Sequence, residues 1–256
     1  MRCAAAVRAG EAGFVAEPGV WGDVHVRRVL VSLDEFLEPA ELPGLPRPEE
    51  LIALDARLAG LGAAGPLRVL DIEAVSIATG HLAAFLVGVG TVREPRLLEV
   101  EQFLLADLGA EAALLRAVSA RVTGAFLLTY NGRAFDMRVL GSRCVANGIH
   151  PGSVEPAAHL DLLASTRRLF RDRLRACTLR QAELRLLRYD REDDVPGLEG
   201  PGRYRAWLRG GPAEALTGVV EHNRLDLCGT AALAAHLAAH VNRLPTHLLA
   251  AARYNV

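Results

Sequence analysis

Four carboxylates and one histidine in this sequence stand in settings that favour catalysis over plain solvation. They are Asp71, Glu73, Asp136, His222 and Asp226. Carboxylates that gather in one place repel each other and cannot all stay ionised unless cations balance them. Divalent ions bound through oxygen provide that balance, and two ions about 4 Å apart can activate a water and stabilise the leaving oxygen of a phosphodiester. The residue types therefore point to metal-dependent cleavage of phosphodiester bonds.

Asp71 and Glu73 lie at the end of a short apolar run, 67–70, that predicts a buried strand. Residues two apart on a strand point to the same face, so both carboxylates would face the same way. Such a pair makes a good platform for a metal at a sheet edge or crevice. The alternative is a solvated strand end whose acids face water, and this pair alone does not decide between the two.

The other three side chains are expected on helices. Asp136 falls near the start of a helix that should begin at about Ala134, where the first backbone N–H groups also favour an acid for structural reasons alone. His222 and Asp226 are four residues apart on a predicted helix and share one face, although such a pair is often a surface contact. Each motif is weak by itself, and the prediction rests on their combination.

The elements that must position these groups follow a regular order after residue 67. Strands are predicted over 67–71, 83–87, 97–104, 125–130 and 159–161, and helices over 110–122, 134–147, 178–187 and from 212 onward. Thr178 and Gln181 form a capping box at one helix start, and Pro212 suits the first turn of the last helix. This series predicts an α/β fold with a mixed five-stranded sheet flanked by helices.

The first 66 residues are less regular, because four prolines between positions 39 and 48 interrupt the chain. Within them, 24–33 predicts one or two strands and 48–61 a short helix. The expected division is an N-terminal extension over 1–66 packed on the main domain, a main domain over 67–245 and a C-terminal tail over 246–256.

The composition is that of an ordinary globular protein, with 51% hydrophobic residues and a formal net charge of -1 in 256 residues. This charge argues against a coat protein that binds DNA non-specifically, although a local basic patch can still serve an enzyme. The chain has no lysine, so a mechanism that needs one is excluded. The four cysteines are widely spaced and suggest neither a zinc site nor disulfides. We expect no membrane span, no signal peptide and a cytoplasmic location.

The motifs together resemble those of the DEDD (DnaQ-like) 3′–5′ exonucleases of the RNase H-like fold, particularly the bacterial YprB-like group. The resemblance covers roughly residues 67–242. It lies in Asp71-x-Glu73, Asn131-x3-Phe135-Asp136 and His222-x3-Asp226, with the flanking phrases Phe85-Leu-Val-Gly88, Thr129-Tyr-Asn-Gly132 and His159-Leu-Asp-Leu-Leu163.

This resemblance implies a 3′–5′ exonuclease that acts on single-stranded DNA or RNA and uses two Mg²⁺ or Mn²⁺ ions. It implies that Asp71 bridges the two ions, that Glu73 and Asp226 complete the first metal site, and that Asp136 holds the second ion. His222 would orient or deprotonate the attacking water. DNA and RNA remain open alternatives, as does a catalytically silent module that binds nucleic acid or a partner.

The sequence departs from the family near the last motif. Members place a Tyr four residues before the last Asp or a His five before it, whereas here His222 stands four before and Glu221 five before. Two threonines that often follow the second acid are Ala74 and Val75 here.

Four residues are expected to contact the nucleic acid: Asn131, Phe135, Arg167 and Arg168. The two arginines begin a segment, 167–188, that carries eight Arg against one Asp and one Glu and could track a phosphate backbone. A solvated helical face is the alternative for most of these arginines. Asp161 is expected to play a structural part beside the site.

Overall fold

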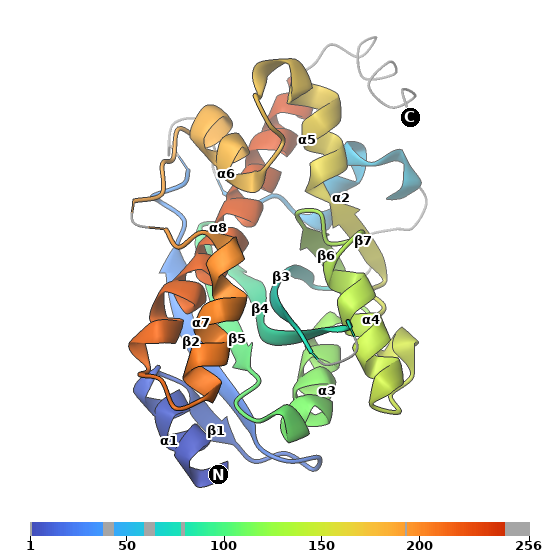
Figure 1. Cartoon of the computed structure of the whole chain (residues 1–256). Helices are drawn as coiled ribbons and strands as arrows, with labels where there is room; N and C mark the ends of the chain where they lie inside the picture. Colours follow the sequence, from blue (N-terminus) through green and yellow to red (C-terminus); the bar gives the residue numbers. More distant parts are fainter. Residues whose placement is uncertain (1, 38–43, 59–64, 78–79, 193, 244–256) are drawn as a thin grey trace.

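The computed structural model describes residues 2–37, 44–58, 65–77, 80–192 and 194–243. Within them a seven-stranded sheet has the order β1-β2-β5-β4-β3-β6-β7. Its strands are β1 (Val15–Glu17), β2 (Val24–Ser32), β3 (Leu67–Ser76), β4 (Leu82–Glu94), β5 (Leu97–Leu104), β6 (Phe126–Thr129) and β7 (Ala158–Asp161). The mixed sheet flanked by helices confirms the predicted fold class (Figure 1).

The prediction of five strands was wrong, because β1 and β2 from the N-terminal segment join the same sheet. β2 pairs antiparallel with β5 over eight positions, from His25 opposite Leu104 to Ser32 opposite Leu97. The β-branched run in β2 thus finds backbone partners in the sheet. The position of any domain boundary stays a prediction, and the proposed tail over 246–256 lies outside the described residues.

Strand direction follows from the connections between strands. β3, β4 and β5 are successive antiparallel neighbours, whereas β6 runs parallel to β3, and β7 runs parallel to β6. Parallel neighbours need a crossover, and the helices between β5 and β6 and between β6 and β7 supply it.

The described α-helices are α1 (Arg2–Glu11), α2 (Pro48–Leu51), α3 (Glu111–Val122), α4 (Asp136–Ala146), α5 (Leu162–Phe170), α6 (Leu179–Ala182), α7 (Gly200–Leu208) and α8 (Glu214–Asn242), with a π-helical turn over Glu183–Leu187. α2 begins at Pro48 as predicted but gives way after Leu51 to two 3-10 turns. The predicted cap of α6 is present, since the Thr178 hydroxyl accepts a hydrogen bond from the Gln181 N–H.

Helices cover both faces of the sheet. Alternate residues of β3 enter separate apolar clusters: Val69 packs with α5 and the C-terminal two-thirds of α8, whereas Leu70 and Ile72 pack with α3 and α4. Figure 1 shows α8, drawn in orange to red, lying along the sheet. Among the described helices, none is both long and apolar enough to cross a membrane.

Candidate active site

β3 carries the first two candidate residues, but in its interior and not at its end. The strand continues five residues beyond Asp71, to Ser76, and a register shift against β4 falls between Glu73 and Ala74. The sequence-based strand end was therefore placed too early. Asp71 is partly exposed, and Glu73 keeps 9% of its surface accessible.

An amide from α8 holds Asp71 in place. The Asn223 side-chain nitrogen donates to the Asp71 carboxylate over 2.7 Å and to the Asp71 backbone carbonyl over 3.2 Å. Asn223 is itself fixed, because its side-chain oxygen accepts from Gln102 of β5 over 2.9 Å. This buried pair ties α8 to the sheet at the position of Asp71.

Close approach between α8 and β4 depends on a residue without a side chain. Gly88 pairs with Asp71 across the ladder, and a Cβ there would overlap Asn223 and come within 2.6 Å of Leu227. The glycine that ends the phrase Phe85-Leu-Val-Gly88 thus makes room for the helix that carries the last motif.

Asp136 reaches the same strand from the other side. β6 pairs with β3 only from Leu67 to Val69, so the Ile72 N–H has no partner in the β6 ladder. Asp136 is the first residue of α4, and its carboxylate accepts a hydrogen bond from that N–H over 3.1 Å. Asp136 is 5% exposed and links the start of α4 to the centre of β3.

His222 and Asp226 lie one turn apart on α8 and face β3. The His222 Nε2 atom is 3.7 Å from the Asp226 carboxylate and 3.9 Å from the Glu73 carboxylate. Its Nδ1 atom lies 2.7 Å from the Asp194 carboxylate. The imidazole therefore stands between the candidate metal ligands and an acid that the motifs do not include.

A buried arginine stands behind Asp226. The Arg191 guanidinium makes an ion pair of 2.6 Å with Asp226 and one of 3.1 Å with Asp194, and donates twice to Glu183 over 2.7 Å. The side chains of Arg191 and Glu183 are 1% and 0% exposed. The family motifs give no signal for this cluster, because Glu183, Arg191 and Asp194 belong to none of them.

The charges at this site are unbalanced. Burial, together with the neighbouring carboxylates of Asp226, Asp136 and Glu73, raises the pKa of Asp71 well above its usual value. Burial raises the pKa of Glu73 to about 7, with His222 opposing the shift. Burial also raises the pKa of Asp136 to about 7, although its backbone hydrogen bonds oppose this. A cation placed among these groups would favour their ionised forms.

The site is not closed around an ion. Among the residues that the structure describes, no group of three or more His, Cys, Asp or Glu side chains is arranged to hold a metal as it stands. One carboxylate oxygen of Asp226 is engaged in the ion pair with Arg191, and one carboxylate oxygen of Asp71 accepts the hydrogen bond from Asn223. The donor set nevertheless fits Mg²⁺ or Mn²⁺, because hard oxygen ligands and surplus negative charge are what these ions require.

The predicted substrate residues fall into two groups. Asn131 is exposed in a left-handed turn with φ 68°, and Phe135 is 39% exposed directly before Asp136. Arg167 is exposed on α5, whereas Arg168 donates to the backbone carbonyl of Leu54 over 2.7 Å. Only the first three side chains present unengaged surface for a ligand in this structure.

Asp161 fixes the loop that carries Asn131. Its carboxylate accepts from the backbone N–H groups of Asn131 and Leu163 through one oxygen and of Arg133 through the other, over 2.8 to 3.1 Å. These bonds agree with the structural part expected for this residue.

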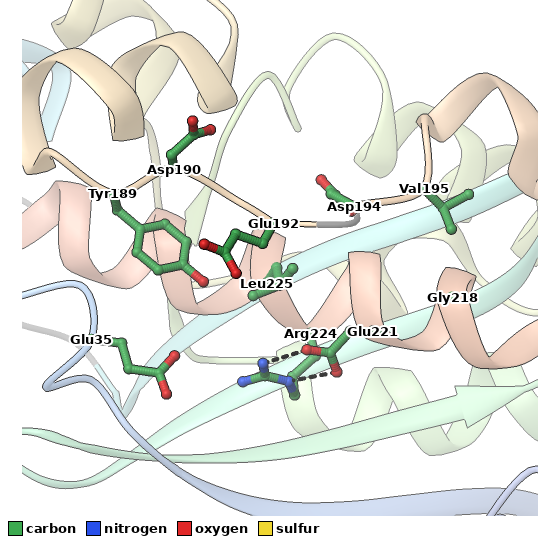
Figure 2. A pocket seen from close by; sticks show the side chains of 10 residues that line it. All are labelled: Glu35, Tyr189, Asp190, Glu192, Asp194, Val195, Gly218, Glu221, Arg224 and Leu225. Atoms are coloured by element: carbon green, nitrogen blue, oxygen red, sulfur yellow. Dashed lines mark hydrogen bonds and ion pairs between the residues drawn. The ribbon is translucent and has the colours of Figure 1, made fainter.

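An acidic cavity of about 410 Å³ borders the segment that carries Asp194 (Figure 2). Its charged lining residues are Glu35, Asp190, Glu192, Asp194, Glu221 and Arg224. Arg224 is paired with Glu221, as the dashed lines show. A surface of this sign repels a polyanion, so a nucleic acid strand is not expected to cross it.

Comparison with known proteins adds two findings. The family model described as the RNase_H superfamily matches residues 69–238. The chain is also 31% identical over 153 residues to "Uncharacterized protein YprB" of Bacillus subtilis (strain 168), which covers 60% of this chain and 37% of that protein. The chain thus matches well under half the length of this relative. These likenesses support a nuclease or nucleic-acid-related activity.

Proposed function

Because this chain belongs to the RNase H superfamily, we propose that it is a metal-dependent nuclease, specifically a 3′–5′ exonuclease on single-stranded DNA or RNA. The observation that carries the proposal is the convergence of Asp71, Glu73, Asp136 and Asp226 around the middle of β3. Burial and mutual repulsion raise the pKa values of the first three of them, so the one guanidinium beside Asp226, that of Arg191, does not balance their negative charge. Buried ionisable groups with strongly shifted pKa values gather at functional sites, which supports a catalytic use for this cluster.

The proposed ligands of two Mg²⁺ or Mn²⁺ ions are Asp71, Glu73, Asp136 and Asp226. When bound, the ions would polarise the phosphodiester and lower the pKa of the attacking water. Asp71 would help to hold an ion, because the carboxylates of Asp226 and Asp136 are close enough to raise its pKa and Asn223 fixes its own carboxylate. Asp226 has one oxygen on Arg191, which leaves the oxygen nearer His222 for an ion.

His222 is proposed to take a proton from the attacking water through Nε2. That atom faces the space bordered by Glu73 and Asp226, and the opposite ring nitrogen is engaged by Asp194. The water O–H bond breaks and the proton moves to Nε2. The hydroxide oxygen then bonds to phosphorus while the bond from phosphorus to the 3′ oxygen of the preceding nucleotide breaks, and that oxygen takes up a proton from solvent. An imidazole is suited to this step because its pKa lies near neutral pH.

The end of the nucleic acid is proposed to lie beside the start of α4. Phe135 offers an exposed ring there for stacking against a base, and Asn131 offers an amide on the same turn. Arg167 would contact a phosphate. We propose no substrate contact for Arg168 as it stands, because its guanidinium is engaged with Leu54.

The test is cleavage of 3′- and 5′-labelled single-stranded DNA and RNA with Mn²⁺, comparing the wild type with Asp71→Asn. The variant keeps an oxygen that can accept from Asn223 but removes the charge. We expect shortening from the 3′ end in the wild type and a loss of at least about a hundredfold in the variant, because stabilisation by the metals is worth several kcal/mol.

Asp190→Asn is the matched control. Asp190 is an acid with a 68% exposed side chain, 3.9 Å from Arg180 and outside the carboxylate cluster, and its loss should leave cleavage unchanged. If a folded wild type binds either polymer but cleaves neither with Mn²⁺ or Mg²⁺ present, the silent binding module replaces the nuclease. The observation that favours the binding module as a second candidate is the ion pair between Asp226 and Arg191, because it engages a carboxylate that the nuclease would need for a metal.

A further inference from the structure

The segment between α6 and α7 brings into the site an acid that belongs to none of the motifs. A π-helical turn over Glu183–Leu187 ends at Arg188, whose backbone is left-handed with φ 58°. The chain then passes along α8, and Figure 2 shows Asp194 on this segment. The Asp194 carboxylate lies 2.7 Å from Nδ1 of His222 on α8. Asp194 is 28 residues from His222 in sequence, so local spacing gives no hint of the pair.

Each oxygen of Asp194 has one partner. Oδ1 lies 2.7 Å from His222 Nδ1, and Oδ2 accepts from Arg191 over 3.1 Å. The side chain is 4% exposed. Burial alone would raise the pKa of Asp194, but the hydrogen bonds from His222 and Arg191 outweigh it and hold that pKa below its usual value. An ionised Asp194 can only accept, so the proton of this hydrogen bond stays on Nδ1.

Arg191 is held just as firmly. Both of its bonds to Glu183 are 2.7 Å long, and Glu183 is fully buried against α8. Room for that carboxylate exists only because position 229 of α8 is glycine, since a Cβ there would overlap the Glu183 side chain. Gly229, Glu183 and Arg191 thus form a rigid support for Asp194.

We infer that Asp194 is a positioning residue that fixes His222 as the Nδ1–H tautomer and turns its unprotonated Nε2 toward Glu73 and Asp226. The inference rests on the proposed function for its catalytic meaning, because the free Nε2 lone pair serves as a base only if this site activates a water. It also gives a physical reason for the departure from the family spacing: a histidine four residues before the last Asp can serve when an acid outside the motif orients it.

In the proposed reaction the two ring nitrogens of His222 have different roles. Nε2 accepts the proton of the attacking water, while Nδ1–H stays with Asp194, and the resulting imidazolium is stabilised by the Asp194 charge. Asp194 touches neither substrate nor water and gains no proton.

The decisive experiment is a ¹⁵N long-range NMR spectrum of the imidazoles in metal-free protein, recorded at a pH where His222 is neutral. His222→Gln identifies the signals. We expect the Nδ1–H tautomer in the wild type, its retention in Asp190→Ala, and a shift to the Nε2–H tautomer in Asp194→Ala. Asp190 lines the same cavity but has no contact with His222, which makes it the matched control.

Activity gives the second readout. Asp194→Ala should lower kcat by about ten- to a hundredfold with little change in KM, because the base is misdirected while the substrate contacts remain. An Nε2–H tautomer in the wild type, or an unchanged tautomer in Asp194→Ala, would overturn the inference whether or not the protein cleaves nucleic acid. A wild type that shows the expected tautomers but cleaves nothing would count against the nuclease alone, and cleavage unaffected in Asp194→Ala would overturn the positioning role.

Discussion

At the scale of single residues, the candidate site is a place where protonation and folding are coupled. Glu73 lies inside β3, within reach of His222 and beside other carboxylates, and its pKa rises from 4.5 to about 7 mainly through burial. Between those two pH values the folded protein holds a proton on Glu73 that the unfolded chain has released. The unfolding free energy contributed by this residue therefore falls as pH rises through that window.

Replacing Glu73 by Gln should remove this loss. In metal-free protein, the gain in unfolding free energy of Glu73→Gln over wild type should be larger at pH 8 than at pH 5, by up to about 3 kcal/mol. Urea denaturation at the two pH values measures the difference. Glu94→Gln, at an exposed position at the end of β4, is the control and should show no such trend. An equal gain at both pH values would mean that Glu73 is ionised in the folded state.

Only some of the residues at the candidate site could be predicted from the sequence. The residues of the motifs could be named because residue type and order are visible in the sequence. Asn223, Asp194 and Arg191 could not, because their importance comes from partners that are 28 or more residues away or buried in another element. Asn223 stood one position from His222 without any pattern to single it out.

At the scale of elements, most of the helices and strands after residue 67 could be predicted from apolar periodicity and capping residues. The predicted strand over 97–104 has the bounds of β5, and the predicted helix over 110–122 differs from α3 by one residue. The end of β3 could not be predicted, because a polar residue inside a strand looks like a strand end until the helix packed on it is known. The packing around α8 depends instead on two glycines: Gly88 of β4 lets the helix approach the sheet, and Gly229 makes room for Glu183.

Gly229→Ala tests this packing. The added methyl would overlap the Glu183 carboxylate, which is buried and tied to Arg191, so we expect a loss of about 1–3 kcal/mol of unfolding free energy despite the better helix propensity of Ala. Gly141→Ala in α4 is the matched control, since a Cβ there meets nothing within 4 Å, and it should raise stability by up to about 1 kcal/mol. Chemical denaturation of both variants gives the comparison, and equal stability of the two would contradict the support proposed for Arg191.

At the scale of the whole molecule, the strand count shows what sequence could not settle. The N-terminal segment is broken by prolines and suggested an appendage, yet β2 is hydrogen-bonded to β5 along its length. Sheet neighbours far apart in the chain leave no periodic signal in either strand, so membership of one sheet is visible only in the fold. Arg28 also makes salt bridges with Glu17 of β1 and Glu101 of β5, on either side of β2 in this added edge.

The carboxylate cluster also makes a prediction for the whole fold. A cation that binds the folded chain and not the unfolded one raises the unfolding temperature, and saturation at about 100 times Kd supplies about 2.7 kcal/mol. For a chain of this size, that amounts to a rise of about 5–10 °C in Tm on adding Mn²⁺. The rise should be large at pH 8 and small at pH 5, because protons compete with the metal for Asp71, Glu73 and Asp136, whose pKa values lie above their usual range.

Calorimetry with and without EDTA measures the rise in Tm. Asp71→Asn is expected to lose most of this rise, and Asp190→Asn is expected to keep it. A rise of equal size in Asp71→Asn would place the bound ion elsewhere on the molecule and remove the charge argument for a metal beside β3.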